Sequence, residues 1–160
     1  MKWMATTLYA LAILACSIRV GADGPDRGAA AAVEQHIQQH AEALGGEQPL
    51  RRRLSEPFDF DGLRESDVAV VYWIGVDNDT TAFLAVFESS NGAWSLTYQV
   101  RLGGRGLRHI TGVEYSEHLI SIECLEFAGH EPLSSPSLRV KIKASVRKGL
   151  LMLERELREE

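Results

Sequence analysis

The 160-residue sequence is poor in cysteine and has no excess of positive charge. It contains only two cysteines, which excludes a small fold held together by several disulfides. The 17 basic and 22 acidic side chains give a formal net charge of -5, which argues against a protein that binds nucleic acid through its phosphates. With 45% hydrophobic and 24% charged residues, the composition is that of an ordinary globular domain and not of a disordered or collagen-like chain.

One apolar run stands at the amino terminus. It extends from Trp3 to Ala15 after a single lysine, which fits the core of a secretory signal peptide and is short for a membrane span. Two processing sites compete: a cut after Ala22 would remove residues 1–22, whereas a lipoprotein-type cut before Cys16 would remove residues 1–15 and leave that cysteine to carry a lipid. We therefore expect a periplasmic protein or an outer-membrane lipoprotein of a bacterium.

Processing changes the charge and the role of the second cysteine. Removal of residues 1–22 deletes Lys2 and Arg19 and no acidic residue, so 15 basic and 22 acidic side chains remain and the formal net charge becomes -7. Either cut leaves Cys124 without an intramolecular disulfide partner. The stability of the domain must then come from its hydrophobic core, for which about 140 residues is sufficient length.

The remaining chain divides into a helix-and-linker segment, residues 23–57, and a β domain, residues 58–160. Apolar residues recur at helical spacing within Ala29–Leu44, which predicts one amphipathic helix. Gly45-Gly46 then predicts the end of the helix, because glycine tolerates the positive φ found there. We expect this helix to pack on the edge of a sheet or to project as a spacer, and Glu47–Glu56 to be a linker.

From Asp67 onward the apolar pattern becomes strand-like, with turn residues at regular intervals. It predicts a mainly β fold of about seven antiparallel strands, arranged as a meander, a sandwich or a partial barrel, with the single helix at the amino terminus. Asp67–Val76 is apolar on both faces, which predicts a central strand covered on each side. Ser90-Asn91-Gly92 predicts a tight hairpin, because Asn-Gly accepts the backbone angles of a type I′ turn.

Alternation of apolar and polar residues predicts the orientation of the later strands. Five apolar residues are expected to share one face of a single strand: Trp94, Leu96, Tyr98, Val100 and Leu102. Leu138–Val146 alternates in the same way. The composition of Leu150–Arg158 favours a helix, but its position after the turn Arg147-Lys148-Gly149 favours an edge strand, which is our prediction. Its charged end would discourage pairing with another chain.

Asp59-Phe60-Asp61-Gly62, followed by Asp67, places alternate carboxylates in a tight turn before a strand. Calcium sites use carboxylates in this setting, with six to eight oxygen ligands in total. However, Leu63 stands where a third alternating ligand is expected, and Arg64 stands where glycine is usual. The segment therefore indicates either a calcium site formed by Asp59, Asp61 and Asp67 or a degenerate turn without metal, and no other cofactor is expected.

Several segments share a broader resemblance. The carboxylate turn, the apolar runs 67–72 and 83–87, and Gly103–Arg108 resemble exported bacterial proteins with FG-GAP-like calcium loops. The resemblance covers about residues 58–153 and depends on structural motifs, not on catalytic ones. It implies a β domain, and some lipoproteins of similar build imply a role as immunity proteins or inhibitors against peptidoglycan-cutting enzymes. The chain departs from the pattern in the carboxylate turn and at residues 133–137, where a cysteine pair is often expected.

Other candidate groups fall short of a catalytic pattern. His36 and His40 stand four apart, but no third metal ligand is evident and HExxH is absent, so we expect them on a wet, glutamine-rich helix face. Ser145–Lys148 matches the SxxK string of serine acyl enzymes, yet it would span a strand end and a turn. Cys124 is in phase with two isoleucines, which predicts a buried apolar side chain. We therefore expect a protein that is not an enzyme.

The loop Gly103-Gly104-Arg105-Gly106 is followed by further cationic residues. Arginine and aromatic residues often anchor protein contacts, so we expect Arg105, Arg108 and His109 to contact a protein partner. These observations favour an exported cell-envelope binding protein that acts as an inhibitor or immunity protein against a cell-wall-degrading enzyme. The alternative is a structural or calcium-dependent envelope lipoprotein without inhibitory activity.

Overall fold

The structure is a computed structural model that describes residues 25–47, 52–55, 58–62, 66–77, 79–104, 107–127 and 136–158. Its elements are α1 (Pro25–Ala43), β1 (Arg52–Leu54), β2 (Asp67–Val76), β3 (Asp79–Ser90), β4 (Ala93–Gly103), β5 (Arg108–Ser116), β6 (Leu119–Glu126), β7 (Leu138–Arg147) and β8 (Leu150–Leu157). The strands form two antiparallel sheets, the first in the order β1-β2-β3-β4 and the second in the order β5-β6-β7-β8. The prediction of a mainly β fold is confirmed, and in the described part of the chain the two separate sheets form a sandwich and not a closed barrel.

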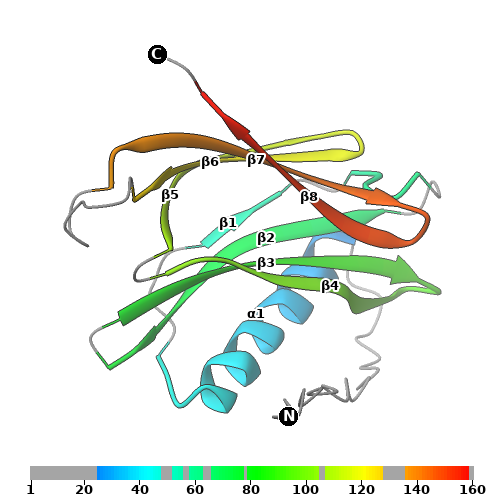
Figure 1. Cartoon of the computed structure of the whole chain (residues 1–160). Helices are drawn as coiled ribbons and strands as arrows, with labels where there is room; N and C mark the ends of the chain where they lie inside the picture. The colour runs from blue at the N-terminus through cyan, green and yellow to red at the C-terminus, as the bar shows by residue number, and fades with distance from the viewer. Residues whose placement is uncertain are drawn as a thin grey trace, which may run out of the picture.

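The first sheet is the middle of three layers (Figure 1). The helix α1 crosses one of its faces, and the second sheet covers the other. Successive residues of β2 alternate between two cores: Val70 and Tyr72 pack toward α1, whereas Ala69 and Val71 pack toward the second sheet. The prediction that β2 is a central strand covered on both sides is confirmed, because its residues from Asp67 to Tyr72 are all buried.

The placement of α1 differs from the prediction. The helix lies across the face of the first sheet, not at a sheet edge and not as a projecting spacer. Four residues form its buried stripe: Ala29, Val33, Ile37 and Ala41. The helical spacing of the apolar residues correctly predicted that one face of α1 is apolar. This spacing does not indicate which part of the protein the apolar face packs against. The helix also begins at Pro25, four residues before the predicted start at Ala29.

The segment Glu47–Glu56 is not simply a linker, as we had expected. Arg52–Leu54 pairs with β2 as the short edge strand β1, and Glu47 forms an isolated bridge with Gly75. The pairing continues at Ser55, whose backbone N–H donates to the Ala69 carbonyl oxygen at 2.9 Å. Edge strands tolerate charged sequences because only one side of their backbone is paired, which is why the arginine-rich composition was misleading.

The prediction that β4 turns a single apolar face to one side is wrong. Tyr98 pairs with Val86, whereas Leu96 pairs with Phe87, so Thr97 is an extra residue in the ladder. This bulge shifts the alternation by one position. As a result, Leu96 packs with Phe87 in the core beneath α1, while Tyr98 packs in the core between the sheets. Trp94 follows Leu96 toward the helix, and Val100 and Leu102 follow Tyr98.

The predicted hairpins and the last strand are confirmed. Asn91 and Gly92 have φ values of 52° and 77°, as a type I′ turn requires, and Lys148 and Gly149 repeat the pattern with 55° and 72°. The second of these turns leads into β8, so the ambiguous carboxyl-terminal segment is a strand and not a helix. The alternating register predicted for β7 is also confirmed, since its apolar residues enter the core between the sheets.

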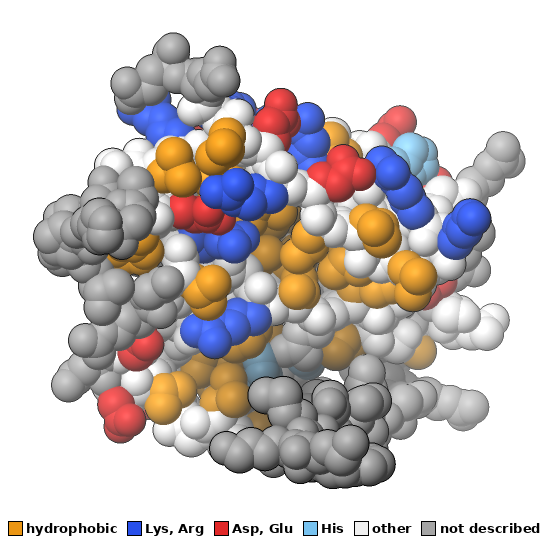
Figure 2. Space-filling model, in the orientation of Figure 1, with side chains coloured by type: hydrophobic (Ala, Val, Ile, Leu, Met, Phe, Trp, Pro, Cys, Tyr) orange, Lys and Arg blue, Asp and Glu red, His pale blue; other side chains and the backbone are white. Residues whose placement is uncertain are grey.

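Charged side chains of both signs cover the outer surface of the second sheet. Figure 2 shows basic and acidic groups interspersed over this part of the molecule. Pairs across β7 and β8 join Lys143 to Glu156 at 2.7 Å and Arg147 to Glu154 at 2.9 Å. Such exposed pairs contribute at most about 1 kcal/mol each, and exposed apolar side chains stand beside them on β8, among them Leu150, Met152 and Leu157.

Several predictions concern residues outside the described part of the chain. Residues 1–22, with both processing sites and Cys16, belong to this group, as do Leu63, Arg64 and Arg105. Among the described residues, no helix has both the length and the apolar character that crossing a bilayer requires.

Candidate functional site

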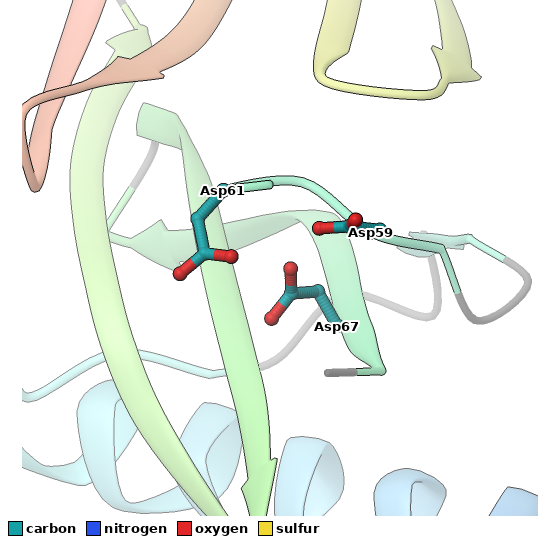
Figure 3. Close-up of side chains that lie close together, drawn as sticks. All are labelled: Asp59, Asp61 and Asp67. Carbon is teal, nitrogen blue, oxygen red and sulfur yellow. The ribbon is translucent and has the colours of Figure 1, made fainter. Parts of the chain in front are cut away.

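Asp59, Asp61 and Asp67 meet at the end of the sandwich where β2 begins (Figure 3). One carboxylate oxygen from each residue lies within 4.8 Å of the other two, and we call this group the carboxylate cluster. The backbone of Phe58 pairs with that of Asp67 through hydrogen bonds of 2.9 and 2.7 Å, which fold the turn over the start of β2. The Gly62 N–H donates to Asp59 Oδ1 at 2.8 Å. The structure therefore brings together the three carboxylates singled out from the sequence.

The electrostatics of the cluster are dominated by Asp67. Its side chain is only 3% exposed and accepts a hydrogen bond of 2.7 Å from the Phe60 N–H. Burial raises its pKa to about 6, the Asp61 carboxylate adds to this increase, and backbone hydrogen bonds from Phe60 and Asp61 oppose it. A divalent cation would relieve the repulsion, but three carboxylates supply fewer oxygens than calcium takes, so backbone carbonyls and water would have to complete the shell.

The second sheet also contacts the carboxylate turn. In the β5–β6 hairpin, His118 has a φ of 59°, and its backbone N–H donates to the Asp59 carbonyl oxygen at 3.1 Å. The turn is thus held by β2 on one side and by the β5–β6 hairpin on the other. This double attachment places the cluster where the two sheets meet, which no local sequence pattern predicts.

A cleft of about 410 Å³ lies at the opposite end of the sandwich, between the β2–β3 turn and the connection from β4 to β5. We call it the arginine cleft. Five of its lining residues carry polar or aromatic side chains: Trp73, Asp79, Thr80, Arg108 and His109. Arg108 and His109, which were predicted to contact a partner, therefore lie together on one concave surface, whereas Arg105 is outside the described residues.

The connection from β4 to β5 depends on close backbone approach. A Cβ atom on Gly103 would lie 2.7 Å from the Arg108 carbonyl oxygen, which is too close for any residue other than glycine. The next residue, Gly104, has a φ of 148° and donates its N–H to the same carbonyl at 3.3 Å. These glycines carry the chain from the first sheet to the second and place Arg108 at the mouth of the cleft.

Arg108 is held by a small ion network on the inner face of the second sheet. Its side chain is 21% exposed, and its Nη2 lies 3.2 Å from Glu126 Oε1. Glu126 is bound more directly by Arg155, which donates from Nη2 at 2.7 Å and from Nε at 3.0 Å to Oε2. Arg108 Nε and Glu126 Oε1 are buried without a hydrogen-bond partner among the described residues, so the Arg108 contact is a charge attraction and not a forked pair.

The prediction that His36 and His40 lie on a wet face is wrong. Both rings are partly buried and turn toward the first sheet, where each has a nitrogen within hydrogen-bond distance of the Tyr72 hydroxyl. Gln99 completes what we call the histidine–tyrosine cluster by donating from Nε2 to the same oxygen at 3.1 Å. The spacing of four in a helix predicted that the two histidines share a face, and the phenol within an apolar strand signalled a need for polar partners, but only the tertiary structure connects them.

The remaining candidates have structural positions. Cys124 is buried, and burial raises the pKa of its thiol, so it is poorly suited to act as a nucleophile. Ser145 lies in β7 and Lys148 lies in the following turn, so they are not brought together by one helical turn as an SxxK enzyme requires.

Comparisons with protein-family models, with curated proteins and with solved structures found no match for this chain. The resemblance to exported proteins with FG-GAP-like loops therefore stays a hypothesis that depends on the motifs alone.

Proposed function

We propose that this protein is an exported, noncatalytic binding protein of the bacterial cell envelope that inhibits or neutralises a cell-wall-degrading enzyme. The observation that supports this proposal best is the arginine cleft. Two residues chosen from the sequence as partner contacts, Arg108 and His109, line it together with the aromatic side chain of Trp73. A concave surface that combines arginine with aromatic groups is typical of the positions that dominate binding energy in protein interfaces.

The mechanism would be steric. The sandwich provides a rigid support, and the connection between β4 and β5 would enter the substrate-binding groove of the target enzyme. His109, which is exposed at the cleft, would contact the target directly, and the partly exposed Arg108 guanidinium would add positive charge beside it. The mature chain predicted from the sequence carries a formal net charge of -7 after loss of Lys2 and Arg19, which would steer it toward a cationic target.

The proposal predicts that immobilised protein retains an envelope enzyme from a periplasmic extract and inhibits purified muramidases in a cell-lysis assay. Arg108→Gln should weaken binding by at least about tenfold, because it removes a charged anchor from the centre of the contact. His118→Asn is the matched control: it changes an exposed residue at the opposite end, and asparagine tolerates the positive φ there. Failure to retain or inhibit any envelope enzyme at micromolar concentration would contradict the proposal.

The carboxylate cluster favours a second candidate, a structural or calcium-dependent envelope lipoprotein without inhibitory activity. Three converging carboxylates would bind calcium weakly at extracellular concentrations. In that case calcium should raise the melting temperature of the wild-type protein, and Asp59→Asn together with Asp61→Asn should abolish the increase. Calcium-independent melting would exclude the calcium-dependent form of this candidate and leave the binding proposal untouched.

Export itself is also a proposal. Removal of residues 1–22 would give a mature chain that begins at Asp23, whereas removal of residues 1–15 would give one that begins with a lipid-modified Cys16. Mass spectrometry of the protein purified from the envelope fraction distinguishes the two, because a diacylated cysteine adds a large and characteristic mass. An intact Met1 terminus would contradict both.

A further inference from the structure

The histidine–tyrosine cluster connects α1 to the first sheet through a single oxygen atom. The Tyr72 hydroxyl extends from β2, and the side chain that carries it is fully buried. Three nitrogen atoms surround this oxygen: His40 Nδ1 at 2.7 Å, Gln99 Nε2 at 3.1 Å and His36 Nε2 at 3.2 Å. The two imidazoles come from α1 and the amide from β4, so this one hydroxyl joins the helix to a strand that lies beyond β3 in the first sheet.

Aromatic rings enclose the two imidazoles. The ring of His40 packs edge-on against Phe83 at 4.6 Å, and that of His36 packs edge-on against Phe87 at 5.4 Å, measured between ring centroids. The two imidazole rings stack on each other at 5.8 Å. Protonation would therefore place two cations side by side against apolar rings, and neither cation could be fully hydrated.

The hydrogen bonds of the cluster require neutral imidazole. The Tyr72 hydroxyl has one hydrogen, and Gln99 donates to its oxygen, so that hydrogen needs an unprotonated nitrogen of His36 or His40. Gln99 Nε2 also lies 2.9 Å from Nδ1 and 3.2 Å from Nε2 of His40. If His40 were protonated, its N–H groups would point at the Gln99 amide nitrogen, which is itself a donor. Rotation of the amide would supply an acceptor, but it would leave the two adjacent cations without a counter-charge.

No described residue facing the cluster from β2, β3 or β4 carries a carboxylate. The strand β2 contributes Tyr72, β3 contributes Phe83 and Phe87, and β4 contributes Gln99 and Arg101, whose register partner is Phe83.

The acidic residues of α1 itself lie on its exposed side. Glu34 is exposed, as is Glu42, which accepts a hydrogen bond from Gln38 at 3.1 Å. Burial lowers the pKa of His36 from 6.5 to about 4, with a further contribution from His40, and burial also lowers the pKa of His40. Both histidines are therefore neutral in the folded protein at pH 7.

We propose that the histidine–tyrosine cluster is an acid-sensitive latch, in which protonation of His36 and His40 loosens α1 from the first sheet. The rest of the attachment is modest, because the buried stripe of α1 consists of two alanines with Val33 and Ile37. A released helix would expose the apolar face of the first sheet, where Phe83 and Phe87 lie. This inference is independent of the proposed binding function, since it involves the opposite face of the first sheet from the arginine cleft.

The direction of the pH effect follows from the difference in proton binding between the latched and the released helix. An unlatched helix binds protons near pH 6.5, whereas the latched form binds them only near pH 4 at His36, so acid favours release between these values. At pH 5 we expect the equilibrium constant for opening to rise by at least about tenfold relative to pH 7, after allowance for the partial exposure of the rings. Release should be local, because no histidine of the cluster belongs to the second sheet.

Amide hydrogen exchange tests the latch in the purified full chain. After correction for the intrinsic effect of pH, protection of the α1 amides should fall by about tenfold or more between pH 7 and pH 5, while the amides of the central strand β6 should keep theirs. NMR titration of the imidazoles should place His36 and His40 below pH 6.5. Unchanged protection of α1 at pH 5, or imidazoles that titrate at or above pH 6.5, would overturn the proposal.

Variants separate the latch from other acid effects. His36→Gln combined with His40→Asn keeps a polar atom near each bonding position but cannot titrate near pH 6, so the acid-dependent loss of α1 protection should disappear. Asp67→Asn is the matched control, because it removes a titrating group on the other side of the first sheet and should leave the α1 loss intact. The same loss of protection in the histidine double variant as in the wild type would show that acid acts elsewhere. If the double variant fails to fold, the wild-type titration and exchange data remain decisive.

Discussion

The two faces of the first sheet carry two titrating clusters with opposite responses to acid. On the side of the second sheet, burial raises the pKa of Asp67 to about 6, so the folded state carries its charge at a cost at neutral pH. On the side of α1, burial lowers the pKa of His36 to about 4, so the folded state keeps this ring neutral. The same physical cause, removal of a charged group from water, therefore disfavours the carboxylate of Asp67 on one face and the imidazolium of His36 on the other.

The difference makes the overall pH dependence a poor guide to either face. As pH falls from about 6 toward 3.8, the folded state binds the Asp67 proton more tightly than the unfolded state, so stability increases. As pH falls from 6.5 toward about 4, the unfolded state binds the His36 proton more tightly, so stability decreases. The two contributions overlap and partly cancel, and a flat melting curve against pH would conceal local changes on both faces.

The largest effect is expected from removal of the buried tyrosine. Tyr72→Ala should lower the free energy of unfolding by about 3–5 kcal/mol, because it leaves a cavity beneath α1 and removes the oxygen shared by the latch. Tyr98→Ala removes a tyrosine that is only partly buried between the sheets and should cost clearly less. Urea denaturation at pH 7 measures both, and equal losses would mean that the helix-facing core has no special role.

Neutralising the buried carboxylate should have an intermediate effect of opposite sign. Asp67→Asn should raise the free energy of unfolding at pH 7 by about 1–2 kcal/mol, because it removes a charge that burial and Asp61 disfavour and leaves an oxygen to accept from Phe60. The gain should vanish toward pH 4, where the wild-type carboxyl is protonated. Urea denaturation at several pH values measures the gain, and destabilisation at pH 7 would indicate that the charge is needed there, as a bound cation would require.

Removal of the histidine titration should have a smaller effect. Between pH 7 and pH 5, the wild-type protein should lose about 1 kcal/mol more than the variant with His36→Gln and His40→Asn, after allowance for the solvent screening of partly exposed rings. In the Asp67→Asn background, where the opposing contribution is gone, this loss should become directly visible in the melting temperature. A loss of the same size with and without the two histidines would assign it to other groups.

Salt should have the smallest effect and should act on one face only. Raising sodium chloride from about 0.05 to 0.5 M screens the repulsion between Asp61 and Asp67 and should stabilise the protein by a few tenths of a kcal/mol. The desolvation that shifts the histidines is not a long-range charge effect, so exchange of the α1 amides at pH 7 should not change. Asp61→Asn should abolish the salt effect on the melting temperature, and a salt effect that persists would have to come from the charged surface of the second sheet.

The sequence allowed much of the sheet structure to be predicted, because hairpins depend on local chemistry. Asn91-Gly92 forms a tight turn whose angles both of its residues favour, Lys148-Gly149 forms a second one in which Gly149 favours the positive φ, and the alternation of β7 specifies which side is buried. Asp59 and Asp61 were expected near Asp67 for the same reason, since all three belong to one short segment. The bulge at Thr97 was missed because alternation alone reads as an uninterrupted strand, and the extra residue becomes visible only when its partners on β3 are known.

What the sequence determined by itself is the local part of this protein: a mainly β chain, one amphipathic helix, turns at defined positions and three carboxylates close along the chain. The tertiary structure decided which surfaces those elements share. Thirty-two residues or more separate His36 and His40 from Tyr72, and 59 separate His40 from Gln99, so no local period relates them. They meet because α1 must bury its apolar stripe and the first sheet offers a face that the second sheet leaves uncovered, which is a property of the assembled layers and not of any segment.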